Sequence, residues 1–204
     1  PLDGATEATV VVEPGVRLLR VVALPVAANL VEGNLQLAVG EKLNQEVARA
    51  GDRAPLELQT TRYGWNPLRG SSGLQRVWEL GLSPAPLLQL KTSLGLGEAS
   101  LDMTGLALSD LQTDMGVGFT RVTLPAQGRF QASIDGAVGM TTVVIPRGLE
   151  ARIRADSGLA VRVMPAGYRR EGDVYSSPGY DSAKDRVDLT LSQAIGLLEV
   201  QTQD

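Results

Sequence analysis

The stretch GVGFTRVTLPAQGRFQASIDGAVGMTTVVIP, residues 116–146, decides the predicted fold because its parts recur. Gly97, Gly118 and Gly139 stand 21 residues apart, and each follows a leucine or a valine. Beyond each glycine, apolar residues alternate with polar ones, which is the period of a strand with one buried face. A fixed repeat of this length predicts stacked units, because each unit has an apolar face that only its neighbours can cover.

The repeat extends over four units when their positions are aligned at this spacing. The apolar column before the glycines consists of Leu96, Val117, Val138 and Leu159, and Ala160 replaces the glycine of the fourth unit. Two apolar columns after the glycine consist of Leu101, Val122 and Val143, and of Met103, Leu124 and Ile145. The other strand of each unit aligns Leu90, Leu111, Ala132 and Ile153. We predict an all-β fold, a β-solenoid or stacked rack of about 21-residue coils with two strands each. An antiparallel meander of equal hairpins is the alternative.

The C-terminal part first leaves this pattern and then returns to it. Residues 165–185 are polar and rich in Gly, Pro and Ser, which indicates an excursion from the stack. Residues 187–200 repeat the pattern. They align Leu189, Leu191, Ile195 and Gly196 with Ala132, Ile134, Val138 and Gly139. We expect this segment to be the closing coil at the end of the stack. The polar C-terminal residues 200–204 discourage association through its edge.

The first 80 residues are less regular. Strands are predicted by β-branched and alternating content at residues 8–13, 16–25, 34–39, 55–60 and 76–84. We expect Trp78, in the last of these strands, to cover the near end of the stack. The predicted organisation is a β-rich part, 1–80, joined as a layer to a repetitive part, 81–204.

Two segments of the N-terminal part are predicted not to be strands. GEKLNQEVARAG, residues 40–51, favours one short helix, because Leu43 and Val47 are four residues apart and Gly51 can end it. Residues 62–75, RYGWNPLRGSSGLQ, are predicted as a loop that contains Trp65.

The absence of cysteine and histidine restricts the chemistry of the chain. It excludes thiol nucleophiles, Ser-His and Cys-His catalytic groups, and zinc sites built on imidazole or thiolate. The net charge of −4 disfavours nucleic acid as a partner, because binding to phosphates needs a basic surface. We therefore predict neither an enzyme nor a bound cofactor.

The apolar stretch at residues 16–31 bears on the membrane. It is interrupted by Arg17, Arg20 and Pro25 and is too short to span a bilayer, so we predict no transmembrane segment. The chain begins at Pro1 and not at methionine. We expect that a signal peptide or lipid-anchor segment has been removed from its N-terminus, which favours an extracytoplasmic or cell-surface location.

Three aspartates share the 21-residue spacing. Asp114, Asp135 and Asp156 would lie on successive coils, with Ser93 in the column before them. Carboxylates about 4.8 Å apart repel unless they are solvated, hydrogen-bonded or bridged by a cation, and calcium is the metal candidate. The same spacing is close to the ~5 Å between the carboxylates of a retaining glycosidase. The simpler alternative, which we adopt, is that each aspartate caps its own turn, so that no metal site is assigned.

The excursion contains a group of aromatic and basic residues, namely Tyr168, Arg169, Arg170, Tyr175 and Tyr180. Tyrosine offers contact area at a low cost in entropy and arginine offers forked donors, so these residues form a candidate surface for a partner. The alternative is that the tyrosines pack the excursion onto the body of the domain.

The combination of WELGLSPAPLLQLKTSLGLGEASLDMTGLALSDLQTDMGVGFTRVTLP, AVGMTTVVIP and VYSSPGYDSAKDRVDLTLSQAIGLLEV resembles the toast-rack family of bacterial proteins. It is also similar to the C-terminal domain of the cell-wall-active antibiotic response proteins. The resemblance covers residues 78–200 well and the N-terminal part loosely, and it supplies no catalytic residues. It implies an all-β rack of stacked strands and a frequent position outside the cytoplasm. The antibiotic-response proteins carry membrane helices, and the resemblance to them implies a regulatory role in envelope-stress signalling.

These observations together favour a non-catalytic, extracytoplasmic β-solenoid module for cell-envelope attachment or protein interaction. The partner would be a protein or another component of the envelope. Two alternatives stay open: a carbohydrate-active enzyme that uses the stacked aspartates, and a regulator of an envelope-stress sensor.

Overall fold

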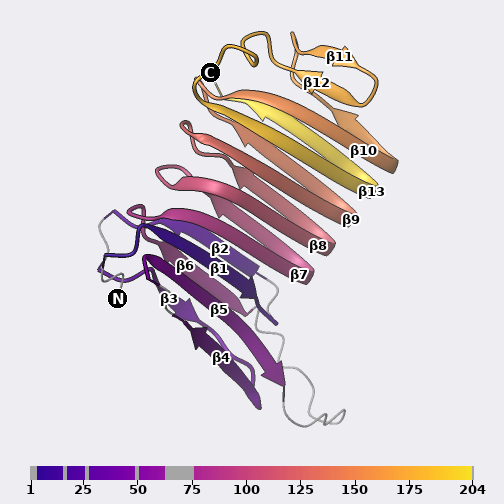
Figure 1. The fold of residues 1–204 in the computed structure, drawn as a ribbon. Helices are drawn as coiled ribbons and strands as arrows, with labels where there is room; N and C mark the ends of the chain where they lie inside the picture. Colours follow the sequence, from indigo (N-terminus) through magenta and orange to yellow (C-terminus); the bar gives the residue numbers. More distant parts are fainter. Residues whose placement is uncertain (1–3, 16–17, 26–27, 49–50, 63–75, 204) are drawn as a thin grey trace.

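The computed structural model describes residues 4–15, 18–25, 28–48, 51–62 and 76–203. In this part of the chain all regular structure is β, and 13 strands form one mixed sheet (Figure 1). The strands are β1 (Glu7–Glu13), β2 (Leu18–Ala23), β3 (Val31–Leu35), β4 (Glu41–Val47), β5 (Arg53–Arg62), β6 (Val77–Leu82), β7 (Leu87–Asp102), β8 (Ala107–Thr123), β9 (Arg129–Ile145), β10 (Glu150–Val163), β11 (Arg169–Glu171), β12 (Val174–Ser176) and β13 (Arg186–Thr202). The all-β prediction is confirmed. Within the described ranges we find no helix able to cross a membrane.

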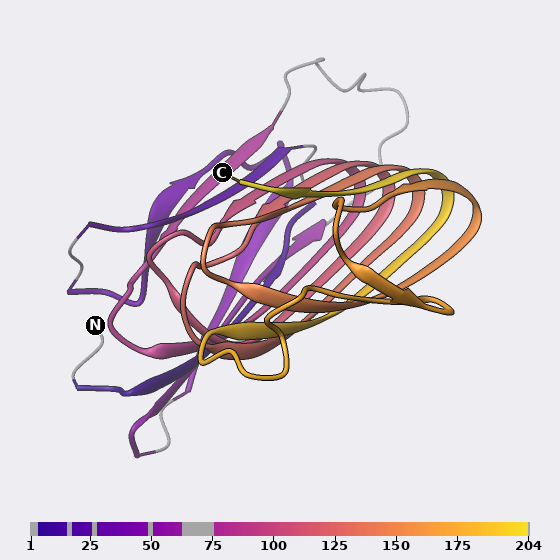
Figure 2. The same ribbon diagram turned by 90° about the horizontal axis from the view of Figure 1, so that it is seen from above.

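Five long strands, β7, β8, β9, β10 and β13, form the regular part of the sheet, and each bends once so that it has the shape of a U in Figure 2. We call each of these strands a rung, the part before the bend its first arm and the part after it its second arm. In β7 the first arm is 87–94 and the second is 98–102. Every pairing between rungs is parallel, so the antiparallel meander is excluded.

The core lies between the two layers of arms. One buried column of the first arms, at most 3% exposed, consists of Leu90, Leu111, Ala132, Leu189 and Ile153. Buried positions of the second arms include Leu101, Val122 and Val143, all at most 1% exposed and in register. These columns carry the aligned positions of the 21-residue repeat, so the predicted register is confirmed.

A column of glycines makes the bends. Gly97, Gly118, Gly139 and Gly196 all have φ between 123° and 146°, a region that other residues rarely adopt. A Cβ added at Gly118 would lie 1.8 Å from the carbonyl oxygen of Gly97, and the same holds for each later glycine of the column. At Gly118, Gly139 and Gly196 the backbones therefore stack so closely that only glycine fits, whereas the outermost rung, β10, has Ala160 in this column.

The order of the rungs differs from the expected one. The residue matches predicted for β13 are confirmed, since Leu189 pairs with Ala132 and Gly196 with Gly139. However, β13 is not at the end of the stack, because it lies between β9 and β10. The prediction of a closing coil is therefore wrong in its position.

One buried polar contact explains why β13 fits beside β9. Gln193 is 1% exposed, and its Oε1 accepts a hydrogen bond of 2.8 Å from the Thr141 hydroxyl of β9. Its register partner on β9 is Gly136, where an added Cβ would lie 2.2 Å from the Gln193 Oε1. The missing side chain of Gly136 thus leaves the space that Gln193 fills. The excursion between β10 and β13 supplies the chain needed to return to this place.

The N-terminal strands continue both layers of the stack. β1 pairs in parallel with the first arm of β7 and with β5, whereas β2 pairs with the second arm of β7 and with β6. Trp78 is completely buried on β6, beside Leu19 of β2 and Leu35 of β3. It is therefore part of the core that these N-terminal strands share.

The predicted helix at residues 40–51 is wrong. Residues Glu41–Val47 form β4, which pairs antiparallel with β5. The single apolar pair Leu43 and Val47 is a weak helix signal, and backbone pairing along seven residues of β5 outweighs it. The predicted loop at 62–75, with Trp65, falls outside the described residues except for Arg62, which ends β5.

Candidate functional site: an apolar strip at the bends

A row of exposed apolar side chains follows the bends of all five rungs. The residues directly before the glycine column are in register, and each is between 41% and 82% exposed: Leu96, Val117, Val138, Ile195 and Leu159. The residues directly after it add Phe119, Met140 and Val161, which are at least 37% exposed. We call these eight residues the apolar strip.

The position of the strip follows from a change of alternation at the bend. In β7 the buried positions are even-numbered up to Leu94 and odd-numbered from Ala99 onwards. Leu96 continues the buried alternation of the first arm, but the chain turns there through Gly97 and the side chain points to solvent. Single exposed apolar residues are ordinary on a protein surface, whereas an exposed row of five in register, with three more beside it, is typical of a binding surface.

The aligned apolar column before the glycines was predicted from the sequence, but its exposure to solvent was not. The aligned leucines and valines before each glycine have the same composition as a core column. A signal was present, because the alternation of apolar residues changes phase across each glycine. A phase change of this kind marks a bend, and residues at the outside of a bend are exposed.

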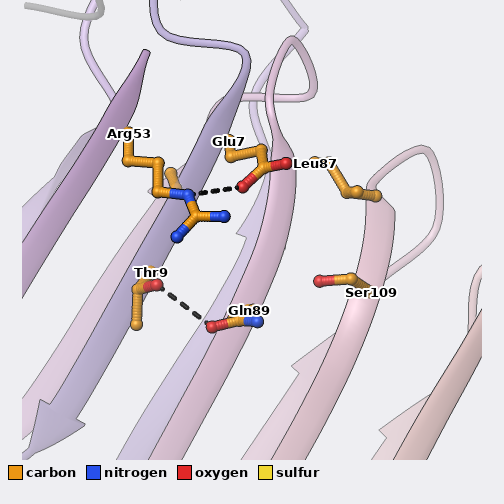
Figure 3. Close-up of a pocket in the computed structure, with 7 residues that line it drawn as sticks. Glu7, Thr9, Arg53, Leu87, Gln89 and Ser109 are labelled. Carbon is orange, nitrogen blue, oxygen red and sulfur yellow. Dashed lines mark hydrogen bonds and ion pairs between the residues drawn. The ribbon is translucent and has the colours of Figure 1, made fainter. Parts of the chain in front are cut away.

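A small polar cavity lies on the outer face of the first-arm layer, where β5, β1, β7 and β8 are neighbours (Figure 3). Its volume is about 270 Å³. Arg53 Nε donates to Glu7 Oε2 over 2.9 Å, and the Thr9 hydroxyl donates to Gln89 Oε1 over 3.2 Å. The other lining residues are Ala8, Leu87 and Ser109.

A β-bulge places the last of these residues. Leu88 pairs with Leu108 and Gln89 with Asp110, so Ser109 is an extra residue on β8. Its hydroxyl donates to the Leu88 carbonyl over 3.2 Å. Glu7 is the single carboxylate among the lining residues, and it is paired with an arginine. The cavity can offer hydrogen bonds to a polar ligand, but it does not hold the two carboxylates of a glycosidase.

The aspartate column is interrupted. Asp114 and Asp135 are register partners on β8 and β9, with Ser93 beside Asp114 as expected. Ser192 of β13 lies between Asp135 and Asp156, so the expected adjacency of all three carboxylates is wrong. The prediction that each aspartate caps its own turn is also wrong, because all three lie within strands. The Ser133 hydroxyl donates to Asp135 Oδ2 over 3.1 Å. Within the described ranges, no three acidic, histidine or cysteine residues are grouped so that they could hold a metal ion.

The tyrosines of the excursion are packed against the body of the protein. Tyr175 and Tyr180 are 9% and 4% exposed, and the Tyr180 hydroxyl donates to Asp188 Oδ1 over 2.6 Å. The Arg152 guanidinium lies over the Tyr180 ring, 4.2 Å from its centroid. Burial, together with the nearby charge of Glu150, raises the pKa of Tyr168 to about 12.

These contacts match the packing alternative for the tyrosines. The side chains of Arg169 and Arg170 remain exposed, the first in an ion pair of 3.3 Å with Glu171. Partner binding by these two arginines stays a prediction.

Comparison with a family model decides the relationship of this chain to known proteins. Residues 1–144 match the N-terminal domain of toast_rack, DUF2154. The chain belongs to the toast-rack family. This finding confirms the resemblance inferred from the sequence, and the match runs from the N-terminal strands through the first three rungs.

Solved structures give a second comparison for this toast-rack protein. It is similar to the crystal structure of a candidate cell adhesion protein from Clostridium sporogenes, with a TM-score of 0.79, 20% sequence identity, and 98% and 95% of the two chains covered. A candidate adhesin from Bacteroides fragilis is matched with a TM-score of 0.34 and 10% identity, over 97% and 94% of the two chains. No curated protein is similar enough in sequence to count as a relative. At this identity, the first likeness shows a shared fold.

Proposed function

We propose that this toast-rack protein is a non-catalytic module for attachment in the cell envelope, and that it binds its partner through the apolar strip. The five rungs form a short β-solenoid that holds the strip rigidly, because the bends of β7, β8, β9 and β13 are each made by a glycine and the stacked backbones there are in close contact. The observation that carries the proposal is the exposure of five large apolar side chains in one register column, with Phe119, Met140 and Val161 exposed beside it.

Two further observations support a binding role over catalysis. The chain lacks cysteine and histidine, which removes thiol nucleophiles and Ser-His groups, and only Asp114 and Asp135 of the expected column of three aspartates are adjacent. The fold is shared with a candidate cell adhesion protein. An extracytoplasmic or cell-surface location, with a protein or envelope component as partner, agrees with this role. A regulatory role in envelope stress stays a prediction from the family resemblance.

Adhesion of coated beads to bacterial cell envelopes tests the proposed function. Beads that carry the chain should be retained, and a triple variant with Val117→Ser, Phe119→Ser and Val138→Ser should lose most of this retention, by about tenfold or more. The matched control is Leu87→Ser, because Leu87 is 42% exposed but lies away from the strip. Circular dichroism should show that both variants keep the fold.

Two results would contradict the proposal. One is equal retention of the original chain and the triple variant, which would place binding elsewhere. The other is release of reducing sugar ends from envelope polysaccharide that disappears in Asp135→Asn, which would assign a catalytic role to the aspartates.

A further inference from the structure

The outermost rung of the stack, β10, is covered along one arm only. β12 pairs antiparallel with residues 152–154 of the first arm, and the Ala155 amide donates to the Asp173 carbonyl over 2.9 Å. The second arm, 159–163, pairs with β13 on its inner side. On its outer side no strand of the described residues pairs with it, so it is an open sheet edge.

Other strands at the ends of the sheet are protected by their composition. β4, Glu41–Val47, presents mostly charged and amide side chains, and β3 has exposed Glu32, Gly33 and Asn34. Charged and polar residues of this kind commonly block edge-to-edge pairing. The second arm of β10 has the opposite character, because Leu159, Val161 and Val163 are 82%, 64% and 43% exposed.

The charge in this segment is directed away from the open face. Arg162 Nη1 donates to the Ala155 carbonyl over 2.9 Å and to Asp173 Oδ1 over 3.0 Å. Its side chain is 25% exposed, and the neighbouring Val161 and Val163 point to the other face. A strand that approaches this edge therefore meets an apolar row and no unpaired arginine.

The sequence of this edge is complementary to itself. In an antiparallel pair centred on Val161, Leu159 of each copy lies opposite Val163 of the other, and the two Val161 side chains are neighbours. Apolar and β-branched cross-strand pairs stabilise antiparallel sheets. The twofold arrangement also closes on itself, since each copy has one such edge among its described residues.

We propose that the second arm of β10 pairs antiparallel with the same segment of a second copy, which gives a twofold dimer joined through a continuous second-arm layer. An edge of five residues buries well below the roughly 800 Å² per partner of a stable complex, so the dimer is weak. Where many chains are attached to one surface, their local concentration would be high enough to form this dimer. The dimer uses the two strip residues of β10, Leu159 and Val161, and leaves the strip residues of the other four rungs open to the envelope partner.

Sedimentation velocity of the whole chain from about 10 µM to about 1 mM tests this proposal, because weak complexes of this size become populated in that range. We expect a reversible monomer–dimer equilibrium that stops at the dimer. Val163→Lys, at an edge residue outside the strip, should weaken it at least tenfold, by roughly 1.4 kcal/mol or more, since lysine on an edge strand opposes pairing. The matched control is Val117→Lys, the same change on the strip but three rungs from the edge.

Three results would overturn the proposal: a monomer at the highest concentration, growth beyond the dimer, or equal weakening by both lysine variants. Growth beyond the dimer would indicate head-to-tail contacts, and equal weakening would place the contact on the strip as a whole. Hydrogen exchange supplies an independent measurement, because the amides of residues 159–163 that point away from β13 should become protected in the dimer. Bead retention by Val163→Lys separates this proposal from the proposed function, because Val163 lies outside the apolar strip and loss of the dimer should leave retention intact.

Discussion

Two columns of the same five rungs have the same apolar composition and opposite environments. The inner column, which contains Leu111 and Leu189, is at most 3% exposed, and the outer column, which contains Val117 and Ile195, is at least 41% exposed. Both are in register across the stack. Repeated apolar residues therefore identify which positions stack on one another, whereas the direction of the chain at the bend decides which of them are buried.

The glycine column separates these two environments, and changing it should have the largest effect. Gly118→Ala places a Cβ 1.8 Å from the Gly97 carbonyl oxygen at a φ of 146°. Nothing can relax without moving the backbone of the neighbouring rung, so we expect a loss of more than about 4 kcal/mol in the free energy of unfolding. Urea denaturation followed by circular dichroism measures this loss.

Gly95→Ala is the control for that variant. An added Cβ at Gly95 has no atom within 4 Å, and its φ is outside the strained positive range. The expected change in stability is within about 0.5 kcal/mol. Similar stability of Gly118→Ala and Gly95→Ala would contradict the close stacking at the bend.

A direct comparison of the two environments uses neighbouring residues of β9. Ile134 is completely buried, and Val138 is 41% exposed on the strip. Ile134→Ala should lower the free energy of unfolding by about 3 kcal/mol, because it leaves a cavity in the core. Val138→Ala should lower it by less than about 1 kcal/mol. Equal losses in urea denaturation would mean that the strip is buried in the folded chain.

The sequence was informative wherever pairing repeats a local pattern. The spacing of Gly97, Gly118 and Gly139 gave the rungs and their register, and the match of Gly196 to Gly139 is confirmed. Each of these residues needs the same backbone geometry as its neighbour, so the constraint recurs along the chain.

The remaining features depend on contacts between segments that are distant in sequence. The place of β13 brings Gln193 into the space at Gly136, a contact between distant segments that no spacing reveals. The polar cavity combines Arg53 and Glu7 with the bulge at Ser109. The strand β4 forms because β5 supplies its hydrogen-bond partners. Tertiary pairing decides all three, and local propensity is too weak to indicate them.

A partly buried tyrosine of the excursion should make stability depend on pH, and this is the smallest effect that we predict. The pKa of Tyr168 is raised to about 12 from its ordinary value of 10. The folded state therefore keeps the phenol proton above pH 10, where the unfolded chain releases it. The contribution of Tyr168 to the free energy of unfolding is therefore complete below pH 10 and should fall as the pH rises from 10 to 12. After allowance for screening by solvent, we expect a loss of about 1 kcal/mol.

Tyr168→Phe isolates this contribution. The phenylalanine variant cannot ionise, so the fall in its free energy of unfolding between pH 10 and pH 12 should be smaller than that of the original chain. Urea denaturation at several pH values in this range measures both slopes. Tyr180, whose pKa is raised by burial and by its hydrogen bond to Asp188, contributes to the slope that remains. If the free energy of unfolding fell equally with pH in the two proteins, the Tyr168 phenol would be solvated. That result would contradict the packing of this tyrosine against the body of the protein.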